Sequence, residues 1–542
     1  MSLLANRKVV IAAVVPFAAI MVVTIIILND IPTRDVAHRY THMAEAFAQG
    51  DWMYAFHPRI QPLQTVSGGI IAWIFQCNSF MALKIASALW FIAGIFIVWK
   101  LFREIYEDKP WIATAATAFY ALYPHNIVMA SEGLRESSKT FILLLIAWAL
   151  VKIYKNVKAY SGYILLGIGC SMALICRADM VMTGLFLLFT GTVLECREKK
   201  FPRISLIPIV LTGITAVLSS FLNYYLCKHA MPDYRFAEIF VKIAKRPAGC
   251  ADAIMLTAGI MMMLTASAIV MAYLLRKIHV GIFLAAAFIF TLLTSIRAGL
   301  ADKHNTVGEF VNSILEGSFH VVGLLCLLVI IFLIWRKKFT GCEFILCLIV
   351  LANAFFNIVP MQLFHKALYV SSRYLYVAVP LMAGFFAIGV NIIYQFVRKQ
   401  IGDKWARVAL IVYCAGICGG FIFAAVQPQL RAYTRKKDIA VRKGTYALTS
   451  AIQNDYHGEK YRASQHDLQQ YYSKKAPFVL FIPDDKSTVA AYMAGGSCVV
   501  NAQDDPDYFV GNKLPEQFCP KAQKVTEISF GKHSKTLWRI NR

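Results

Sequence analysis

Long apolar blocks separated by short polar segments fill the chain up to about residue 426. Most blocks run for about 18–25 residues, long enough for a helix to cross a bilayer core of ~30 Å. With Lys- and Arg-rich segments setting the side of each loop, the blocks predict about thirteen membrane spans. An odd number places the N-terminus in the cytoplasm and the C-terminus outside. The predicted spans are 9–28, 80–102, 111–128, 139–154, 160–176, 180–195, 205–226, 252–275, 279–296, 318–335, 342–360, 374–397 and 407–426.

The polar residues between the first two spans form a long outer loop, about residues 29–79. Its last part, residues 67–75, is semi-apolar, too short to span, and could lie in the membrane interface.

The composition changes after about residue 427, where polar residues of mixed charge replace the apolar blocks. Gln427-Pro428 is predicted to break the last membrane helix. Helices are expected at 446–456 and 488–493, and strands at 478–483, 498–500, 525–530 and 536–540. The chain therefore predicts an all-α polytopic membrane domain over residues 1–426 and a small extracytoplasmic α/β domain over residues 427–542.

Charge is scarce and unevenly placed along this sequence. Of the 542 residues, 58% are hydrophobic and 16% are charged, with a formal net charge of +24. The Lys and Arg residues cluster in short segments that the positive-inside rule assigns to the cytoplasm. No basic, aromatic-interleaved domain is left to bind nucleic acid. We expect a multi-pass protein of the cell inner (cytoplasmic) membrane.

The thirteen cysteines form no metal-spaced cluster in the sequence. Most lie in apolar spans, where a thiol behaves as a small hydrophobe. Two pairs fall in segments predicted to lie outside, Cys227 with Cys250 and Cys498 with Cys519. Either pair could form a disulfide in an oxidising compartment.

Asp35 follows the first span directly, at the predicted membrane edge, with arginines on both sides. Charges at this depth are costly and need a reason. A carboxylate here could act as a general base for an incoming hydroxyl or amine. The alternative is a solvated loop acid paired with Arg34 or Arg39.

The residues around Asp35 form a longer pattern that resembles a known family. Asp35 is followed by Arg39-Tyr40, Gly50-Asp51-Trp52 and Pro62-Leu63. This pattern is similar to the first outer loop of GT-C fold membrane glycosyltransferases, in the branch of the lipid A aminoarabinose transferases and protein O-mannosyltransferases. Two departures are Val36, where a second acid is usual, and Gln61, where a first proline is usual.

Two later segments continue the resemblance. Leu134-Arg135-Glu136-Ser137 matches a second acidic site, with Glu132 one helical turn from Glu136. Ser372-Arg373-Tyr374-Leu375 matches an Arg-Tyr that opens a late helix. The alternatives are a helix N-terminal acid for Glu136 and headgroup snorkelling for Arg373. Arg177 and Asp179 lie in a very short turn, which favours a structural ion pair.

The resemblance implies a glycosyltransferase that uses a polyprenyl-phosphate-linked sugar and a lipid, glycan or protein acceptor in the cell envelope. Asp35 would be the base and Glu136 a second catalytic acid. Arg373 would bind the donor phosphate, with Arg59, His365 and Lys366 able to assist. Arg39, Tyr40, Glu132, Arg135 and Tyr374 would support them. A divalent cation, Mg or Mn, could bridge Asp35 and Glu136, although no cluster of ligands requires one.

Two other functions are compatible with a polytopic protein. A polymerase or ligase of surface polysaccharide usually concentrates its polar residues in a large late outer loop, whereas here the acids lie in the first two loops. A flippase or transporter should carry charges at mid-span, and Lys84 is the main candidate for one here.

Overall fold

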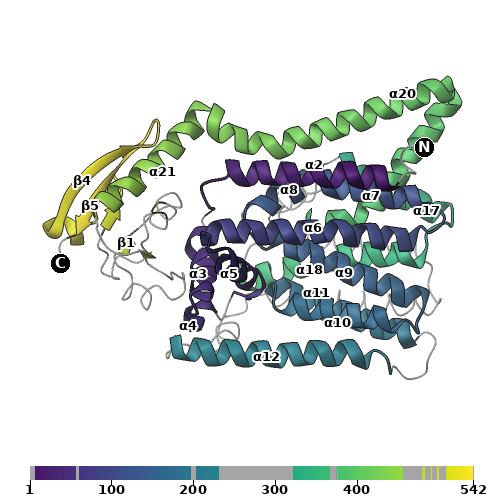
Figure 1. The fold of residues 1–542 in the computed structure, drawn as a ribbon, viewed down its shortest axis with the longest axis horizontal. Helices are drawn as coiled ribbons and strands as arrows, with labels where there is room; N and C mark the ends of the chain where they lie inside the picture. The colour runs from purple at the N-terminus through teal and green to yellow at the C-terminus, as the bar shows by residue number, and fades with distance from the viewer. Residues whose placement is uncertain are drawn as a thin grey trace.

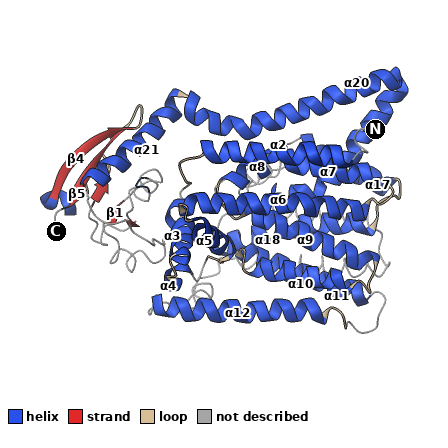
Figure 2. Cartoon of the chain, viewed as in Figure 1, coloured by secondary structure: helices blue, strands red, loops and turns tan. Residues whose placement is uncertain are grey.

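The structure, a computed structural model, shows a bundle of long helices with a small domain of mixed structure at one end (Figures 1 and 2). It describes residues 7–33, 35–56, 60–196, 203–230, 321–365, 374, 376–455, 479–481, 490, 493, 497–499 and 508–540.

Ten long or medium-length helices make up most of the described bundle and follow the predicted spans closely. Two further predicted spans, 252–275 and 279–296, lie outside the described residues. The helices are α2 (Arg7–Leu28), α6 (Ser79–Ile105), α7 (Pro110–Leu122), α9 (Glu136–Lys155), α10 (Tyr160–Leu174), α11 (Ala178–Cys196), α12 (Leu206–Ala230), α17 (Val321–Trp335), α18 (Gly341–His365) and α20 (Ala383–Thr434).

Length and burial mark this bundle as a membrane domain. Among the described residues, four helices are long and apolar enough to cross a membrane: Ser79–Ile105, Glu136–Lys155, Asp179–Cys196 and Tyr376–Gln427. The outward faces keep large apolar side chains exposed, such as Ile27 (69%), Val217 (68%) and Phe423 (65%). Contiguous exposure of this kind is unfavourable in water and ordinary against lipid. The helical bundle is a polytopic, all-α membrane domain, as predicted.

Hydrogen bonds to glutamate side chains define the starts of α18 and α12. Thr340 and Glu343 form a capping box at the start of α18, because Thr340 N donates to Glu343 Oε2 (2.7 Å) and Glu343 N donates to Thr340 Oγ1 (3.5 Å). Glu195, near the end of α11, accepts from the backbone N–H groups of 203–205 that precede α12.

Prolines account for two differences from the predicted elements. The predicted span 111–128 is two helices, because Tyr123 is extended and α8 (Pro124–Ser131) begins at a proline. Proline suits a first helical position, where an N–H would lack a partner. The predicted break at Gln427-Pro428 was wrong, since α20 continues to Thr434. One proline costs a helix about 3 kcal/mol, which the flanking turns of α20 outweigh.

The last two predicted spans are joined within α20. The backbone kinks there at Gly402 (φ 80°, ψ 167°), a conformation that glycine adopts without steric strain. A short 3-10 helix, η2 (Tyr376–Met382), precedes α20.

Four short helices of the first loop cover one end of the bundle, which we call the loop end. They are η1 (Val36–Tyr40), α3 (Thr41–Ala48), α4 (Trp52–Ala55) and α5 (Leu63–Phe75). In Figure 1 they lie at the end nearest the C-terminal domain. α5 contains the predicted interfacial stretch, and Trp73, Ile74 and Phe75 are exposed on it.

The C-terminal domain is the α/β unit that the sequence predicts. α21 (Lys436–Asp455) packs through Leu448 and Ile452 against the sheet residues Ile528 and Leu537. The sheet has the order β2-β1-β3-β5-β4, with β1 parallel to β2 and β3, and β5 antiparallel to β3 and β4. Its strands are β1 (Val479–Phe481), β2 (Ser497–Val499), β3 (Tyr508–Val510), β4 (Ala522–Ser529) and β5 (Ser534–Ile540), with η5 (Glu516–Lys521) before β4.

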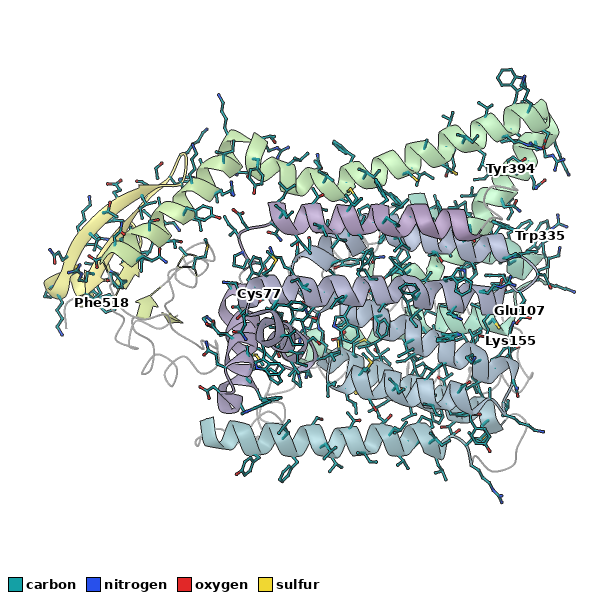
Figure 3. All side chains as sticks on the ribbon, in the orientation of Figure 1. Cys77, Glu107, Lys155, Trp335, Tyr394 and Phe518 are labelled. Carbon is teal, nitrogen blue, oxygen red and sulfur yellow. The ribbon has the colours of Figure 1, made fainter. Side chains whose placement is uncertain are left out.

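The two ends of the bundle differ in chemistry. Figure 3 shows Cys77 at the loop end, on the side of Phe518 in the C-terminal domain, and Glu107, Lys155 and Trp335 at the opposite end. The basic segments that follow α9 and α17 therefore lie away from the loop end, in the alternation that the positive-inside rule expects. The membrane side that each end faces stays a prediction.

Candidate active site

Four predicted site residues, Asp35, Tyr40, Arg135 and Glu136, meet at the loop end. Asp35 immediately precedes η1, a π-helical segment of a kind that is frequent at functional sites. Tyr40 is buried in an apolar cluster with Leu134, the residue before Arg135. The Arg135 guanidinium lies 5.6 Å from the centre of the Tyr40 ring. The first loop thus packs directly on the turn that begins α9 with Glu136.

Both predicted acids act electrostatically on Tyr40. Burial raises the pKa of Tyr40 above its ordinary value. Asp35 and Glu136 act in the same direction, while Arg135 and Arg177 oppose them. Both acids therefore lie within electrostatic reach of one phenol.

Arg177 joins the site from the turn between α10 and α11. Its Nε lies 2.7 Å from Asp179 Oδ1, and its Nη1 lies 3.8 Å from Glu136 Oε1. Its guanidinium carbon stands 3.7 Å from the centre of the Tyr374 ring. Burial lowers the pKa of Arg177, but Asp179, Tyr374 and Glu136 together raise it above its ordinary value. The predicted Arg177–Asp179 ion pair is confirmed, and it reaches beyond its own turn.

A closed circuit of polar contacts, which we call the polar ring, lies behind Arg177. Lys139 Nζ is ion-paired with Asp179 and donates to Asn357 Oδ1 (3.2 Å). Asn357 Nδ2 donates to Asn353 O (2.6 Å), and Asn353 Nδ2 donates to Tyr374 O (3.2 Å). The stacking of Arg177 on Tyr374 closes the circuit. The ring consists of Lys139, Asp179, Arg177, Tyr374, Asn353 and Asn357.

Sequence analysis missed three members of this ring: Lys139, Asn353 and Asn357. Lys139 lies in the polar first turns of α9, Asn353 and Asn357 lie one turn apart in the otherwise apolar α18, and all three are buried. A buried polar group requires a partner, which is the signal that could have pointed to them.

The remaining predicted site residues are only partly described. Glu132 is half-buried at the end of α8. Arg39 lies in η1 and His365 ends α18, but their side chains are outside the description, and Arg59, Lys366 and Arg373 lie outside it altogether. Their roles stay predictions.

The predicted disulfides also involve residues beyond the description. Cys519 is exposed in η5, with Sγ 3.7 Å from Pro515 O, and is a free thiol among the described residues. The side chains of Cys227 and Cys498, and all of Cys250, are not described. Both pairings stay predictions.

A divalent cation bridging Asp35 and Glu136 stays a prediction. Across the described part of the chain, no group of three or more His, Cys, Asp or Glu side chains converges as a metal would require. Glu136 and Asp179 already have cationic partners in Arg177 and Lys139.

The C-terminal domain is fastened to the chain just before Asp35. Asp30 Oδ2 accepts hydrogen bonds from Arg442 Nη2 and Tyr446 Oη, both on α21. Tyr433 Oη donates to Leu28 O (2.7 Å). Burial would raise the pKa of Asp30, but the hydrogen bonds from Arg442 and Tyr446 outweigh it and hold the pKa below its ordinary value. We call this contact the Asp30 clamp.

Comparison with known proteins identifies the architecture. No family model matches the sequence, and no curated protein matches it. Several solved structures are similar along most of the chain, among them the following two. ArnT from Cupriavidus metallidurans, in the apo state, is 13% identical with a TM-score of 0.51, over 97% of both chains. The Archaeoglobus fulgidus oligosaccharyltransferase, in a complex with Zn and sulfate, is 15% identical with a TM-score of 0.50, over 92% of this chain and 67% of that chain.

Both of these proteins are membrane glycosyltransferases with the GT-C fold. The chain described here has that fold, which confirms the predicted resemblance at the level of architecture. Of the two, ArnT is matched over nearly its whole length, including the C-terminal part.

Proposed function

We propose that this protein is a glycosyltransferase that transfers a hexosyl or pentosyl unit from a polyprenyl-phosphate donor to a cell-envelope acceptor, with inversion. The observation that carries the proposal is the convergence of Asp35, Tyr40, Arg135, Glu136 and Arg177 at the loop end of a GT-C bundle. Acids and cations gathered at one end of a membrane domain suit a reaction on a phosphate-linked lipid.

In the proposed reaction, Asp35 accepts the proton of the acceptor hydroxyl or amine. The acceptor atom forms a bond to the anomeric carbon while the bond from that carbon to the phosphate oxygen breaks. The bonding electrons leave with polyprenyl phosphate, which is already anionic and needs no strong general acid. It needs cations at the developing charge, a role that we assign to Arg373 and Arg59. Apolar helices would hold the prenyl chain.

The position of the buried charges supports a transferase over a flippase. Lys84 does not stand alone at mid-span: its Nζ donates to Ile26 O (2.9 Å) and Asn29 O (2.7 Å), where α2 ends. A cation there satisfies carbonyls that lack helical partners. Lys139 and Asp179 lie in the first turns of α9 and α11. Lys84, Lys139 and Asp179 thus lie near the loop end and not at mid-span, whereas the buried acids Glu195 and Glu343 lie at the opposite end.

The test is transfer of a labelled sugar by the purified protein. Asp35→Asn should lower the rate by about 10²–10⁴-fold, the usual contribution of a general base, while the protein stays folded. Glu107→Gln, at the opposite end of the bundle, is the matched control and should keep full activity. Full activity in Asp35→Asn would contradict the assignment of the base. A C-terminal domain that is labelled only from the cytoplasm would overturn the proposed sidedness.

A further inference from the structure

We propose that Arg177 is a positioning residue that holds Glu136 in place for transfer. The other members of the polar ring hold Arg177 in turn. This inference rests on the proposed function and deepens it. Sequence alone favours a local ion pair that closes a helical hairpin. The structure extends that pair to a predicted catalytic acid on another helix, α9.

The contacts of Arg177 favour positioning over direct binding of substrate. Its Nε lies 2.7 Å from Asp179 Oδ1, its Nη1 lies 3.8 Å from Glu136 Oε1, and one face of the guanidinium lies against Tyr374. The residue is only 9% exposed. A planar guanidinium held on an edge and on a face has little freedom to turn toward a ligand.

The polar ring supplies the rigidity that a short turn lacks. Lys139 holds Asp179 from the side opposite Arg177, and Asn357 holds Lys139. The ring connects α9, α11, α18 and Tyr374, which lies two residues before η2, so that four segments must move together if Arg177 moves. A group that must stay within a fraction of an ångström of its working position needs such support.

Charge balance explains why these groups can be buried together. Glu136 and Asp179 carry two negative charges, and Arg177 and Lys139 carry two positive charges. All four are at most 9% exposed. A buried charge without a partner is strongly unfavourable, whereas a balanced and hydrogen-bonded set is tolerated.

The same arginine also reaches the predicted phosphate-binding segment. Tyr374, on which Arg177 stacks, directly follows Arg373 in the sequence. Arg177 therefore connects a predicted acid of the site with the segment that is proposed to hold the donor phosphate.

A double-mutant cycle between Arg177 and Glu136 tests the inference. Arg177→Met and Glu136→Gln should each lower kcat by at least about tenfold, with less than about a twofold change in the donor KM. Because Arg177 acts through Glu136, the double variant should be no slower than the slower single variant. Arg177→Lys should recover part of kcat, since an ammonium can still pair with Glu136.

The controls separate this inference from folding and from the proposed function. Arg103→Met, an exposed arginine at the opposite end, should have wild-type kinetics. If Arg177→Met does not fold, Asp179→Asn is the second variant. It removes the ion pair between Arg177 and Asp179 with little change of side-chain volume, and it should likewise lower kcat with little change in the donor KM. If the two single substitutions multiplied their effects on kcat in the double variant, or if Arg177→Met raised the donor KM at unchanged kcat, Arg177 would bind substrate itself. Either result would overturn this inference and leave the proposed function intact. An inactive wild type would overturn the proposed function, and the inference with it.

Discussion

Lys139 contributes to stability by balancing the charge of the buried acids near it. Its side chain is fully buried, and it is one of two cations that face the two acids of the site. Lys139→Met would leave Asp179 and Glu136 with Arg177 alone. We expect the free energy of unfolding to fall by about 3 kcal/mol, as is usual when one partner of a buried pair is removed.

The matching double variant should reverse most of that loss. Lys139→Met with Asp179→Asn restores one acid to one cation, so unfolding in detergent should return close to the wild-type midpoint. Lys155→Met removes a lysine from a partly exposed ion pair with Glu107 and should leave the midpoint unchanged. Equal stability of Lys139→Met and wild type would show that the ring does not stabilise the fold.

Local pattern in the sequence predicted the ion pair of Arg177 with Asp179, which are close along the chain, and the family resemblance assigned Asp35 and Glu136 to one site. Neither pointed to the buried polar residues behind them. Lys139 meets Asp179 across a separation of 40 residues and Asn357 across 218. Such contacts depend on the packing of α9, α11 and α18, which one sequence does not specify.

At the scale of elements, the close packing of α6 and α7 depends on Gly94. A Cβ atom there would lie 2.1 Å from Tyr120 Oη and 2.8 Å from its Cζ. Tyr120 is buried, stacks on Phe91 and donates to Phe91 O (3.2 Å), so it cannot swing aside. We expect Gly94→Ala to lower the free energy of unfolding by about 1–3 kcal/mol through overpacking.

Gly213 on α12 is a matched control for this substitution. A Cβ at Gly213 would meet nothing within 4 Å. Gly213→Ala should therefore be neutral or slightly stabilising, because alanine favours a helix more than glycine does. If thermal unfolding of the two alanine variants is the same, the α6–α7 packing described here is incorrect.

Elements themselves were predicted well where apolar length alone decides them. α2, α6, α9, α10 and α18 begin and end near their predicted bounds. β3 was missed because three residues, Tyr-Phe-Val, carry too little pattern, and its place is set by pairing with β1 and β5. The continuation of α20 through Pro428 was missed because the low helix propensity of proline is outweighed by the helical turns on both sides of it.

At the scale of the whole molecule, the Asp30 clamp makes docking of the C-terminal domain sensitive to acid. The folded-state pKa of Asp30 is depressed below its ordinary value of 3.8. The clamp therefore contributes its full stability above that value and loses it as the pH falls through the lower, folded-state pKa. Arg442 stays charged throughout, since its pKa is raised.

Limited proteolysis with an acid-active protease can measure this loss. Cleavage between α20 and α21 in the wild type should increase as the pH is lowered from 5 through this window. Asp30→Asn should be cleaved more readily at pH 5 and should show no further increase that titrates in the window. Identical profiles for the two proteins would exclude Asp30 as the group responsible.

The clamp also has a consequence for the order in which the protein is completed. Asp30 and Arg442 are 412 residues apart. At about 5–20 residues per second of synthesis, roughly 20–80 s separate the appearance of one from that of the other. The loop that carries Asp35 therefore leaves the ribosome well before the helix that fastens it.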